Sequence, residues 1–115
     1  WQGGDEFVDA RDAASGLVAA LFADRPVSRD YSVGMGVLHS FEDFVRAARV
    51  AVPGLRVEVR VEPKGGFSGF RFVRQQPSDI GAAKRELGWT PRYDLAATMK
   101  DCAAFISGRH SAELS

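Results

Sequence analysis

The residues best suited to chemistry gather in the stretch 62–77, where cations and aromatic rings lie between glycines. The candidates for contact with a small-molecule substrate are Lys64, Phe67, Phe70, Arg71 and Arg74. Arginine binds phosphate or carboxylate oxygens through a planar fork of N–H donors, and phenylalanine rings line apolar pockets. Two other interpretations remain open: the rings pack against another domain or a dimer partner, and the arginines are solvated surface charges.

No pattern of residues predicts catalysis, cofactor binding or metal binding. The two histidines, one cysteine and scattered carboxylates lack the spacing of a metal site, and no nucleophile lies beside a base. The candidate for a dinucleotide-binding turn is Gly65-Gly66-Phe67-Ser68-Gly69. Counted from Gly66, Gly69 falls at a glycine position, but Phe72 occupies the third glycine position and no helix follows at once. We therefore assign no catalytic, cofactor-binding or metal-ligating residue to this chain.

Composition narrows the class of protein. The chain has 115 residues, enough for one domain, and its 15 basic and 15 acidic residues give a net charge of zero. A balanced charge argues against a nucleic-acid or anionic-membrane partner, and no apolar run is long enough to span a bilayer. The single cysteine excludes an internal disulfide and is compatible with a reducing, cytoplasmic location. Because the chain begins at Trp1, we expect it to be cut from a longer protein.

The substrate residues must be positioned by a small set of elements. Hydrophobic periodicity predicts four helices, over residues 12–23, 40–52, 78–87 and 95–107, and three short strands, over 6–10, 30–33 and 55–61. This is an α/β fold, or α+β if the piece stands alone. So few strands make a thin sheet, which predicts that these elements pack on something outside the chain.

Several helix ends carry specific signals. Ser40 and Asp43 approximate a capping box, while Asp12 is expected to cap the first helix. Gly88 occupies the position of a left-handed C-cap residue, and Gly108 is expected to end the last helix. Trp89 should act as a structural plug between the third and fourth helices.

The same spacing predicts which helix faces are buried. On the first helix, we expect a buried face made of Ala14, Leu17, Val18 and Leu21. On the last helix, the expected buried face is Leu95, Met99, Cys102 and Ile106, which makes Cys102 a structural thiol.

Three segments, in order, resemble a known family. Residues 79–93 read Asp-Ile-x-x-Ala-Lys-Arg-Glu-Leu-Gly-Trp-x-Pro-Arg-Tyr, residues 6–14 read Glu-Phe-Val-Asp-Ala-Arg-Asp-Ala-Ala, and residues 30–36 read Asp-Tyr-Ser-Val-Gly-Met-Gly. Together they resemble the C-terminal region of the extended short-chain dehydrogenase/reductases, the group that includes the NAD-dependent nucleotide-sugar epimerases and dehydratases. Separately, the arginine- and alanine-rich composition, with only three lysines, favours a bacterial source. The resemblance runs from about Gly4 to Ile106.

The resemblance implies that this chain binds the substrate while a part outside it binds the cofactor and carries the catalytic residues. It implies a Rossmann-type N-terminal segment or companion chain that binds NAD or NADP and carries a Tyr-x-x-x-Lys pair; here Tyr31 and Tyr93 lack that lysine. Residues 1–107 would form the substrate-binding C-terminal domain, followed by a polar tail over 108–115. The complete enzyme would be an epimerase, dehydratase or dehydrogenase that acts on a sugar, nucleotide-sugar or related hydroxylated substrate, and a second copy in a homodimer is among the expected partners.

Two departures from the family pattern bear on the substrate. Asp5 stands where many nucleotide-sugar members carry an arginine, and the long loop has no Arg-x-Gly-Asp element. A free sugar acid or a natural-product intermediate is therefore an alternative to a nucleotide-sugar. The alternative to the enzyme itself is a free-standing, non-catalytic module of the same fold that binds a ligand or a protein.

Overall fold

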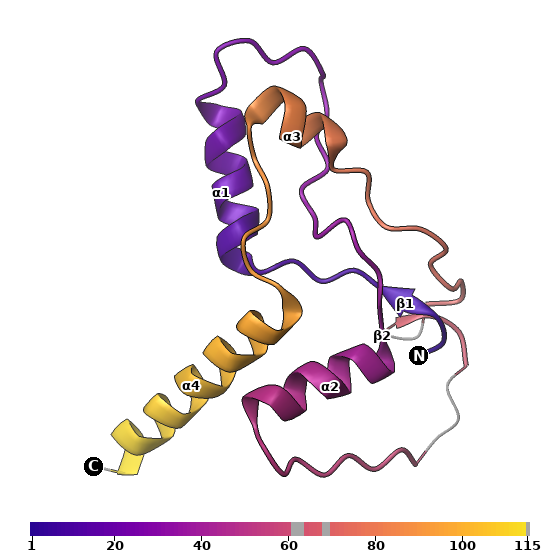
Figure 1. Ribbon diagram of the computed structural model, residues 1–115, viewed down its shortest axis with the longest axis vertical. Coiled ribbons are helices and arrows are strands. Elements are labelled where there is room, and N and C mark those ends of the chain that lie inside the picture. Colours follow the sequence, from indigo (N-terminus) through magenta and orange to yellow (C-terminus); the bar gives the residue numbers. More distant parts are fainter. Residues whose placement is uncertain (61–63, 68–69, 115) are drawn as a thin grey trace.

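The computed structural model describes residues 1–60, 64–67 and 70–114, with side chains described as far as residue 108. Within these ranges it contains the helices α1 (Ala10–Leu21), α2 (Phe41–Ala51), α3 (Gly81–Leu87) and α4 (Leu95–Leu114), and the strands β1 (Gly4–Asp5) and β2 (His39–Ser40) (Figure 1). The strands pair antiparallel, Gly4 opposite Ser40 and Asp5 opposite His39. The mixed helix-and-strand class expected from the sequence is confirmed at this level, as α+β.

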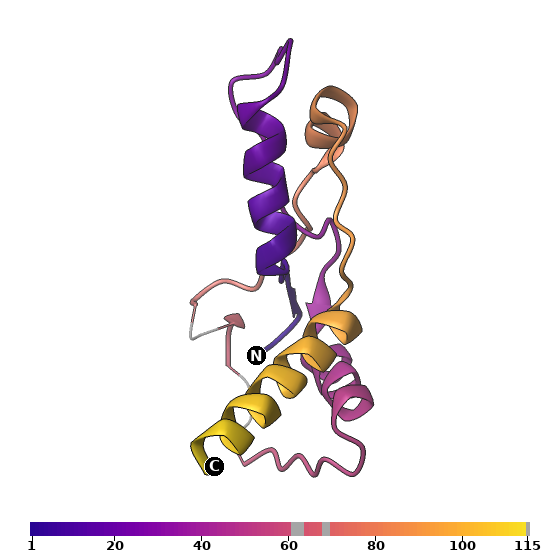
Figure 2. The same cartoon turned by 90° about the vertical axis from the view of Figure 1, so that its left-hand side faces the viewer.

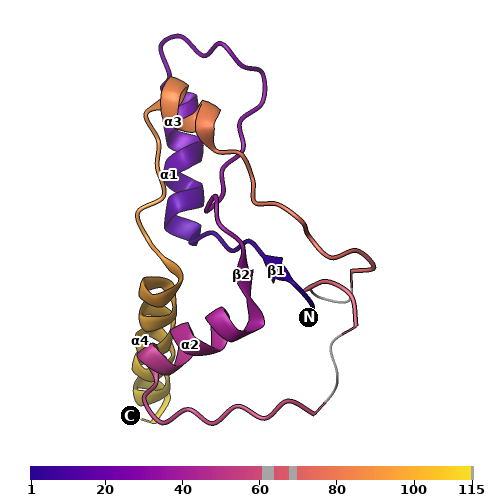
Figure 3. The same ribbon diagram turned by 45° about the vertical axis from the view of Figure 1, so that its right-hand side comes forward.

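The chain is spread into a flat, open arrangement. Helices α1 and α3 lie together at one end, and α2 lies against α4 at the other (Figures 1 and 3). The molecule measures 48 × 41 × 19 Å, and its thin dimension is seen in Figure 2. Its radius of gyration is 17.0 Å, whereas a compact domain of this length has about 13 Å. Much of the surface that a compact fold would cover is therefore open.

The helix starts follow local hydrogen bonding. The capping box at α2 is confirmed: the Ser40 hydroxyl accepts from Asp43 N, and the Asp43 carboxylate accepts from Ser40 N. At α1 the predicted cap was wrong, because Asp9 is the N-cap residue and its side chain accepts from Arg11 N. α3 begins after Ile80 with no side-chain cap.

The helix ends agree with the prediction at α3 and differ at α4. Gly88 closes α3 in the left-handed conformation, with φ of 63°. The Asp94 carboxylate accepts from Ala97 N at the start of α4. The expected end at Gly108 was wrong, since α4 continues to Leu114. One glycine costs a helix only about 1 kcal/mol, which the flanking turns can offset.

The three predicted strands are not found. Residues 6–9 lead directly into α1, and residues 30–33 are irregular. The stretch 55–60 has no strand partner within the described ranges, and residue 61 lies outside them. Alternation of apolar and polar residues signals one buried face, but a strand also needs a neighbour for its backbone hydrogen bonds.

The core is small and is centred on the third of the resemblance segments. Ile80, Ala83 and Trp89 are buried, and Val33 and Leu87 are among the partly buried residues packed against them. No helix in the described part of the chain is long and apolar enough to cross a membrane.

The expected apolar faces of α1 and α4 were largely wrong. On α1 the buried residues are Asp12 and Gly16, while Leu17 is 71% and Leu21 76% exposed. On α4 Leu95 is buried, but Cys102 is exposed and is not the expected structural thiol. A periodic pattern identifies which residues share a face, yet the buried face depends on which elements pack there.

Candidate functional site

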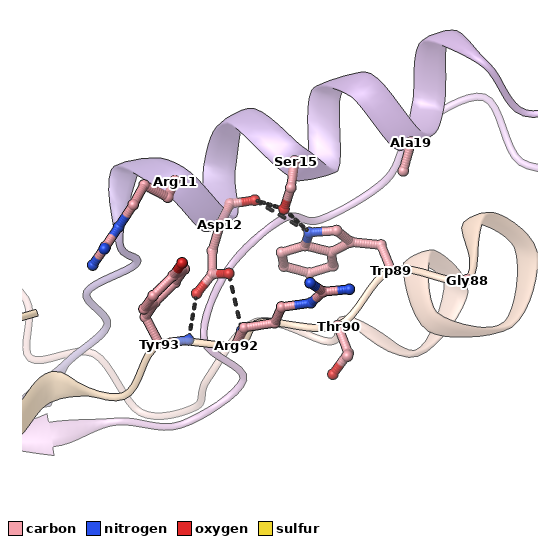
Figure 4. A pocket seen from close by; sticks show the side chains of 9 residues that line it. All are labelled: Arg11, Asp12, Ser15, Ala19, Gly88, Trp89, Thr90, Arg92 and Tyr93. Atoms are coloured by element: carbon pink, nitrogen blue, oxygen red, sulfur yellow. Dashed lines mark hydrogen bonds between the residues drawn. The ribbon is translucent and has the colours of Figure 1, made fainter. Parts of the chain in front are cut away.

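A buried carboxylate, Asp12, joins α1 to the segment between α3 and α4. Its side chain is 1% exposed, and its two oxygens accept from Arg92 N and Tyr93 N, each at 2.9 Å (Figure 4). An extended segment has backbone N–H groups without partners inside the segment itself. A carboxylate that accepts two of these N–H groups forms strong, charge-assisted hydrogen bonds. The carboxylate therefore holds the Pro91–Tyr93 segment against the first turn of α1.

Trp89 completes this joint. Its ring is 4% exposed, and its indole N–H donates to the Asp12 carbonyl at 3.1 Å and to the Ser15 hydroxyl at 2.9 Å. Gly16 makes room for it, because a Cβ at this position would lie 2.7 Å from a Val33 methyl and 3.4 Å from the indole. The prediction of a structural plug is confirmed.

Beside the joint lies an open hollow of about 350 Å³. Most polar groups that line it are already bonded, since Ser15 and Asp12 serve the indole and the backbone amides. The Arg11 guanidinium lies 3.6 Å from the centroid of the Tyr93 ring. Two exposed residues that line the hollow, Thr90 and Arg92, have fewer contacts. The hollow is therefore mainly the surface where α1 packs against the segment between α3 and α4.

Arg11 also connects α1 to α4. Its guanidinium contacts Asp9 at 2.9 Å and Asp101 at 2.6 Å, and the Thr98 hydroxyl donates to Asp9 at 2.8 Å. These bonds, first of all the one from the Arg11 side chain, hold the pKa of Asp9 well below its ordinary value. Asp9 is thus an ionised, buried anchor.

A second buried carboxylate, Glu6, gathers three segments that are far apart in the sequence. Its side chain is 5% exposed and accepts from Gly36 N at 2.6 Å, from the Ser78 hydroxyl at 2.5 Å and from Arg74 at 3.0 Å. Burial alone would raise the pKa of Glu6, but these hydrogen bonds and the Arg74 charge outweigh it and lower the pKa. Glu6 is therefore held as a carboxylate.

Five aromatic rings form a cluster near the N-terminus. Phe67 contacts Trp1 and Phe7 with centroid distances of 5.0 and 5.2 Å, both edge-to-face, and Phe41 and Phe44 complete the set. Edge-to-face pairs place the positive rim of one ring on the negative face of the next. The cluster fastens the stretch that contains Phe67 to the start of the chain and to α2.

The predicted substrate residues do not converge on one pocket in the described residues. Phe67 belongs to the aromatic cluster, and Arg74 is held by Glu6, Asp5 and the Gln76 carbonyl. The remaining three are exposed: Lys64, Phe70 and Arg71. Their role in substrate binding stays a prediction.

Sequence reasoning missed the two carboxylates that organise the structure. Glu6 had been placed in a strand and Asp12 at a helix cap, and neither was given a tertiary role. Each stands beside an apolar or small residue in the segment 6–14, although that segment also contains the charged residues Asp9 and Arg11. An acid at such a place often satisfies backbone N–H groups.

Among the described residues, the buried carboxylates bind backbone N–H groups and so position segments of the chain. No group of three or more histidine, cysteine, aspartate or glutamate residues suited to a metal ion occurs among the described residues. Comparison with known proteins adds no assignment: no protein-family model matches the chain, and neither a curated protein nor a solved structure matches it at a significant level.

Proposed function

We propose that this chain is the substrate-binding portion of an NAD(P)-dependent epimerase, dehydratase or dehydrogenase of the extended short-chain type. The catalytic tyrosine and lysine and the cofactor site would belong to a Rossmann-type segment or companion chain. The chain itself would supply pocket walls for a sugar or a related hydroxylated substrate. Its polar surface residues would hold that substrate while hydride transfer takes place on the other part.

The observation that carries the proposal is that the three resemblance segments meet through buried carboxylates. Glu6, in the first segment, bonds to Gly36 at the end of the second and to Ser78 beside the third. Asp12, also in the first, bonds to the backbone at Arg92 and Tyr93 in the third. Accidental similarity gives no reason for these segments to share the buried polar contacts of one structure.

Uncovered apolar surface supports a missing part. The side chains of Leu17, Val18 and Leu21 on α1, and of Phe22 directly after it, are all more than half exposed and lie on the side opposite Gly16. A contiguous apolar stripe on a helix marks a surface that another element covers. The Rossmann-type segment is the occupant that the family resemblance implies.

The site's charges favour a substrate with little negative charge. Arg74, the cation nearest the buried network, is already paired with Glu6 and Asp5. Lys64 and Arg71 remain as exposed cations. A sugar or sugar acid needs fewer cationic contacts than the diphosphate of a nucleotide-sugar.

The first test is native mass spectrometry of the untagged protein purified from its source. We expect a complex with a chain, or a longer form of the same chain, that carries a glycine-rich dinucleotide fingerprint and binds NAD or NADP. A folded chain that never associates with such a part would remove the enzyme proposal. It would favour the alternative, a non-catalytic binding or interaction module.

The second test uses the complex and separates substrate contacts from cofactor contacts. Arg71→Ala should raise KM for the sugar substrate while leaving NAD(P) affinity unchanged, because the cofactor site lies on the other part. Arg25→Ala, at an exposed arginine far from this stretch, is the matched control. An Arg71 variant with unaltered KM would exclude this residue from the site.

A further inference from the structure

The stretch from Leu55 to Arg60 is an extended segment with no strand partner among the described residues. After α2 the chain runs extended along the rim of the molecule, and Figures 1, 2 and 3 show no strand beside it. Leu55 N donates to Val52 O, and Leu55 O accepts from the Arg49 side chain. Between residues 56 and 60, no backbone group hydrogen-bonds to any described residue. Like an edge strand, a segment with unpaired N–H and C=O groups is a template for pairing with another strand, and we call residues 55–60 the edge segment.

The side chains of this stretch alternate in both polarity and sign. Val57 and Val59 are exposed on one face, and Arg56, Glu58 and Arg60 lie on the other. A parallel in-register pair of two copies would set each charge against its own kind, which is destabilising. An antiparallel pair centred on Glu58 would do the same, with Glu58 opposite Glu58.

An antiparallel pair centred on Val57 places unlike charges opposite each other at its centre and leaves Arg60 opposite Gly54, where Arg60 keeps its ion pair with Glu58 of its own chain. It sets Arg56 opposite Glu58 twice, Val57 opposite Val57, and Leu55 opposite Val59. Opposite charges directly across a ladder are stabilising, and β-branched pairs pack well there. We propose that two copies of this chain associate through residues 54–60 as an antiparallel pair centred on Val57.

The backbone of Leu55 agrees with this register. In an antiparallel ladder, hydrogen-bonded pairs alternate with pairs that make no ladder bonds. If Arg56 of one copy and Glu58 of the other form a hydrogen-bonded pair, then Leu55, Val57 and Val59 lie in pairs that make no ladder bonds. The internal bonds of Leu55 N and Leu55 O can then remain. The two Val57 residues come closest together, because such pairs have Cα atoms about 4.5 Å apart.

Disulfide trapping tests the register. In a Cys102→Ser background, which removes the exposed native thiol, Val57→Cys should form a disulfide-linked dimer on mild oxidation. Val59→Cys is the matched control, since two copies of residue 59 would be offset by about 13 Å along the strands, beyond disulfide reach. We expect cross-linking at least about tenfold slower for the control. Equal rates, or faster cross-linking at position 59, would overturn the register.

Charge exchange tests the partner. By sedimentation velocity the native chain should reach twice its 12.5 kDa mass. Glu58→Arg and Arg56→Glu should each raise the dimer dissociation constant about tenfold, and an equimolar mixture should restore association, because each chain then opposes the other's charge. Both side chains are exposed, and circular dichroism checks that each variant is folded.

Three results would overturn the proposal. The first is a monomer at every concentration, and the second is a mixture that fails to recover. The third is a native dimer in which Val57→Cys does not cross-link. A companion chain that blocks cross-linking at position 57 would show that this edge segment pairs with that chain and not with a second copy. The enzyme proposal depends only on the presence of the companion, so the two proposals fail on different results.

Discussion

Replacing Asp12 by asparagine should weaken the attachment of the Pro91–Tyr93 segment to α1. The carboxylate is 1% exposed and accepts two backbone N–H bonds at 2.9 Å. Asp12→Asn keeps the shape and one acceptor oxygen, but its amide NH₂ faces the second backbone N–H. The variant thus loses one charge-assisted hydrogen bond and leaves a shielded donor without a partner.

The expected cost follows from those two terms. A hydrogen bond to a charged group contributes about 1.5–3 kcal/mol, and an unsatisfied shielded donor costs about 1–3 kcal/mol. These terms overlap, and both amides are only partly buried, so we expect a loss of about 2–3 kcal/mol in the free energy of unfolding. That is a large part of the 5–15 kcal/mol typical of a domain.

Two measurements check this prediction. Urea unfolding followed by the fluorescence of Trp1 and Trp89 gives the global change, and amide exchange at Arg92 and Tyr93 gives the local one. A loss of 2–3 kcal/mol corresponds to exchange roughly 30- to 150-fold faster at these amides. The control is Asp94→Asn, at the exposed start of α4, where asparagine caps nearly as well as aspartate.

The reasoning would be refuted by an Asp12→Asn variant within about 0.5 kcal/mol of the native chain, the range of ordinary surface substitutions. It would also be refuted if the Asp94 control lost as much stability. In either case the joint would not depend on the buried carboxylate.

Three further predictions concern single positions. Gly88→Ala should lower the free energy of unfolding by about 1 kcal/mol, because φ is 63° there although no atom obstructs a Cβ. Gly108→Ala, inside α4, should instead raise it by about 0.5–1 kcal/mol. Thermal unfolding compares the two variants, and equal effects would contradict the prediction. Gly16→Ala should cost about 1–3 kcal/mol, because its Cβ would lie 2.7 Å from a Val33 methyl; an unchanged urea midpoint would show that the seam adapts freely. Acid should destabilise the chain through Glu6, whose folded pKa lies below its ordinary value of 4.5: the stability it contributes is present above pH 4.5 and is lost as pH falls through the lower folded pKa. Urea unfolding across pH 3–6 should therefore show a weaker pH dependence for Glu6→Gln, and an unchanged slope would be contrary evidence.

The open shape explains why the predicted substrate residues remain apart. Phe67 is held at the N-terminal segment by aromatic contacts and Arg74 by Glu6, whereas Arg71 is exposed and takes part in neither contact. A pocket wall needs an opposing wall, and in the proposed enzyme the Rossmann-type segment supplies it. Within the predicted stretch 62–77, residues 62–63 and 68–69 lie outside the described residues.

The sequence by itself determined the local features. The capping box of Ser40 with Asp43, the left-handed Gly88 and the packing of Trp89 were all predicted before the fold was known. The capping box and Gly88 rest on bonds or backbone angles within a few residues, so they need no distant partner. Trp89 was predicted from its place between two helices, but its hydrogen bonds go to Asp12 and Ser15 in α1. Element types therefore followed from sequence wherever helices were concerned.

Only the tertiary structure decided which faces are buried. Asp12 lies inside and Leu21 outside, the reverse of their polarity, because Trp89 and the Pro91–Tyr93 backbone lie on the Asp12 side of α1. The valines of 55–60 alternate as in a strand, yet no described neighbour pairs with them. Burial and strand pairing are properties of two surfaces brought together, and one segment's sequence specifies only its own side of that contact.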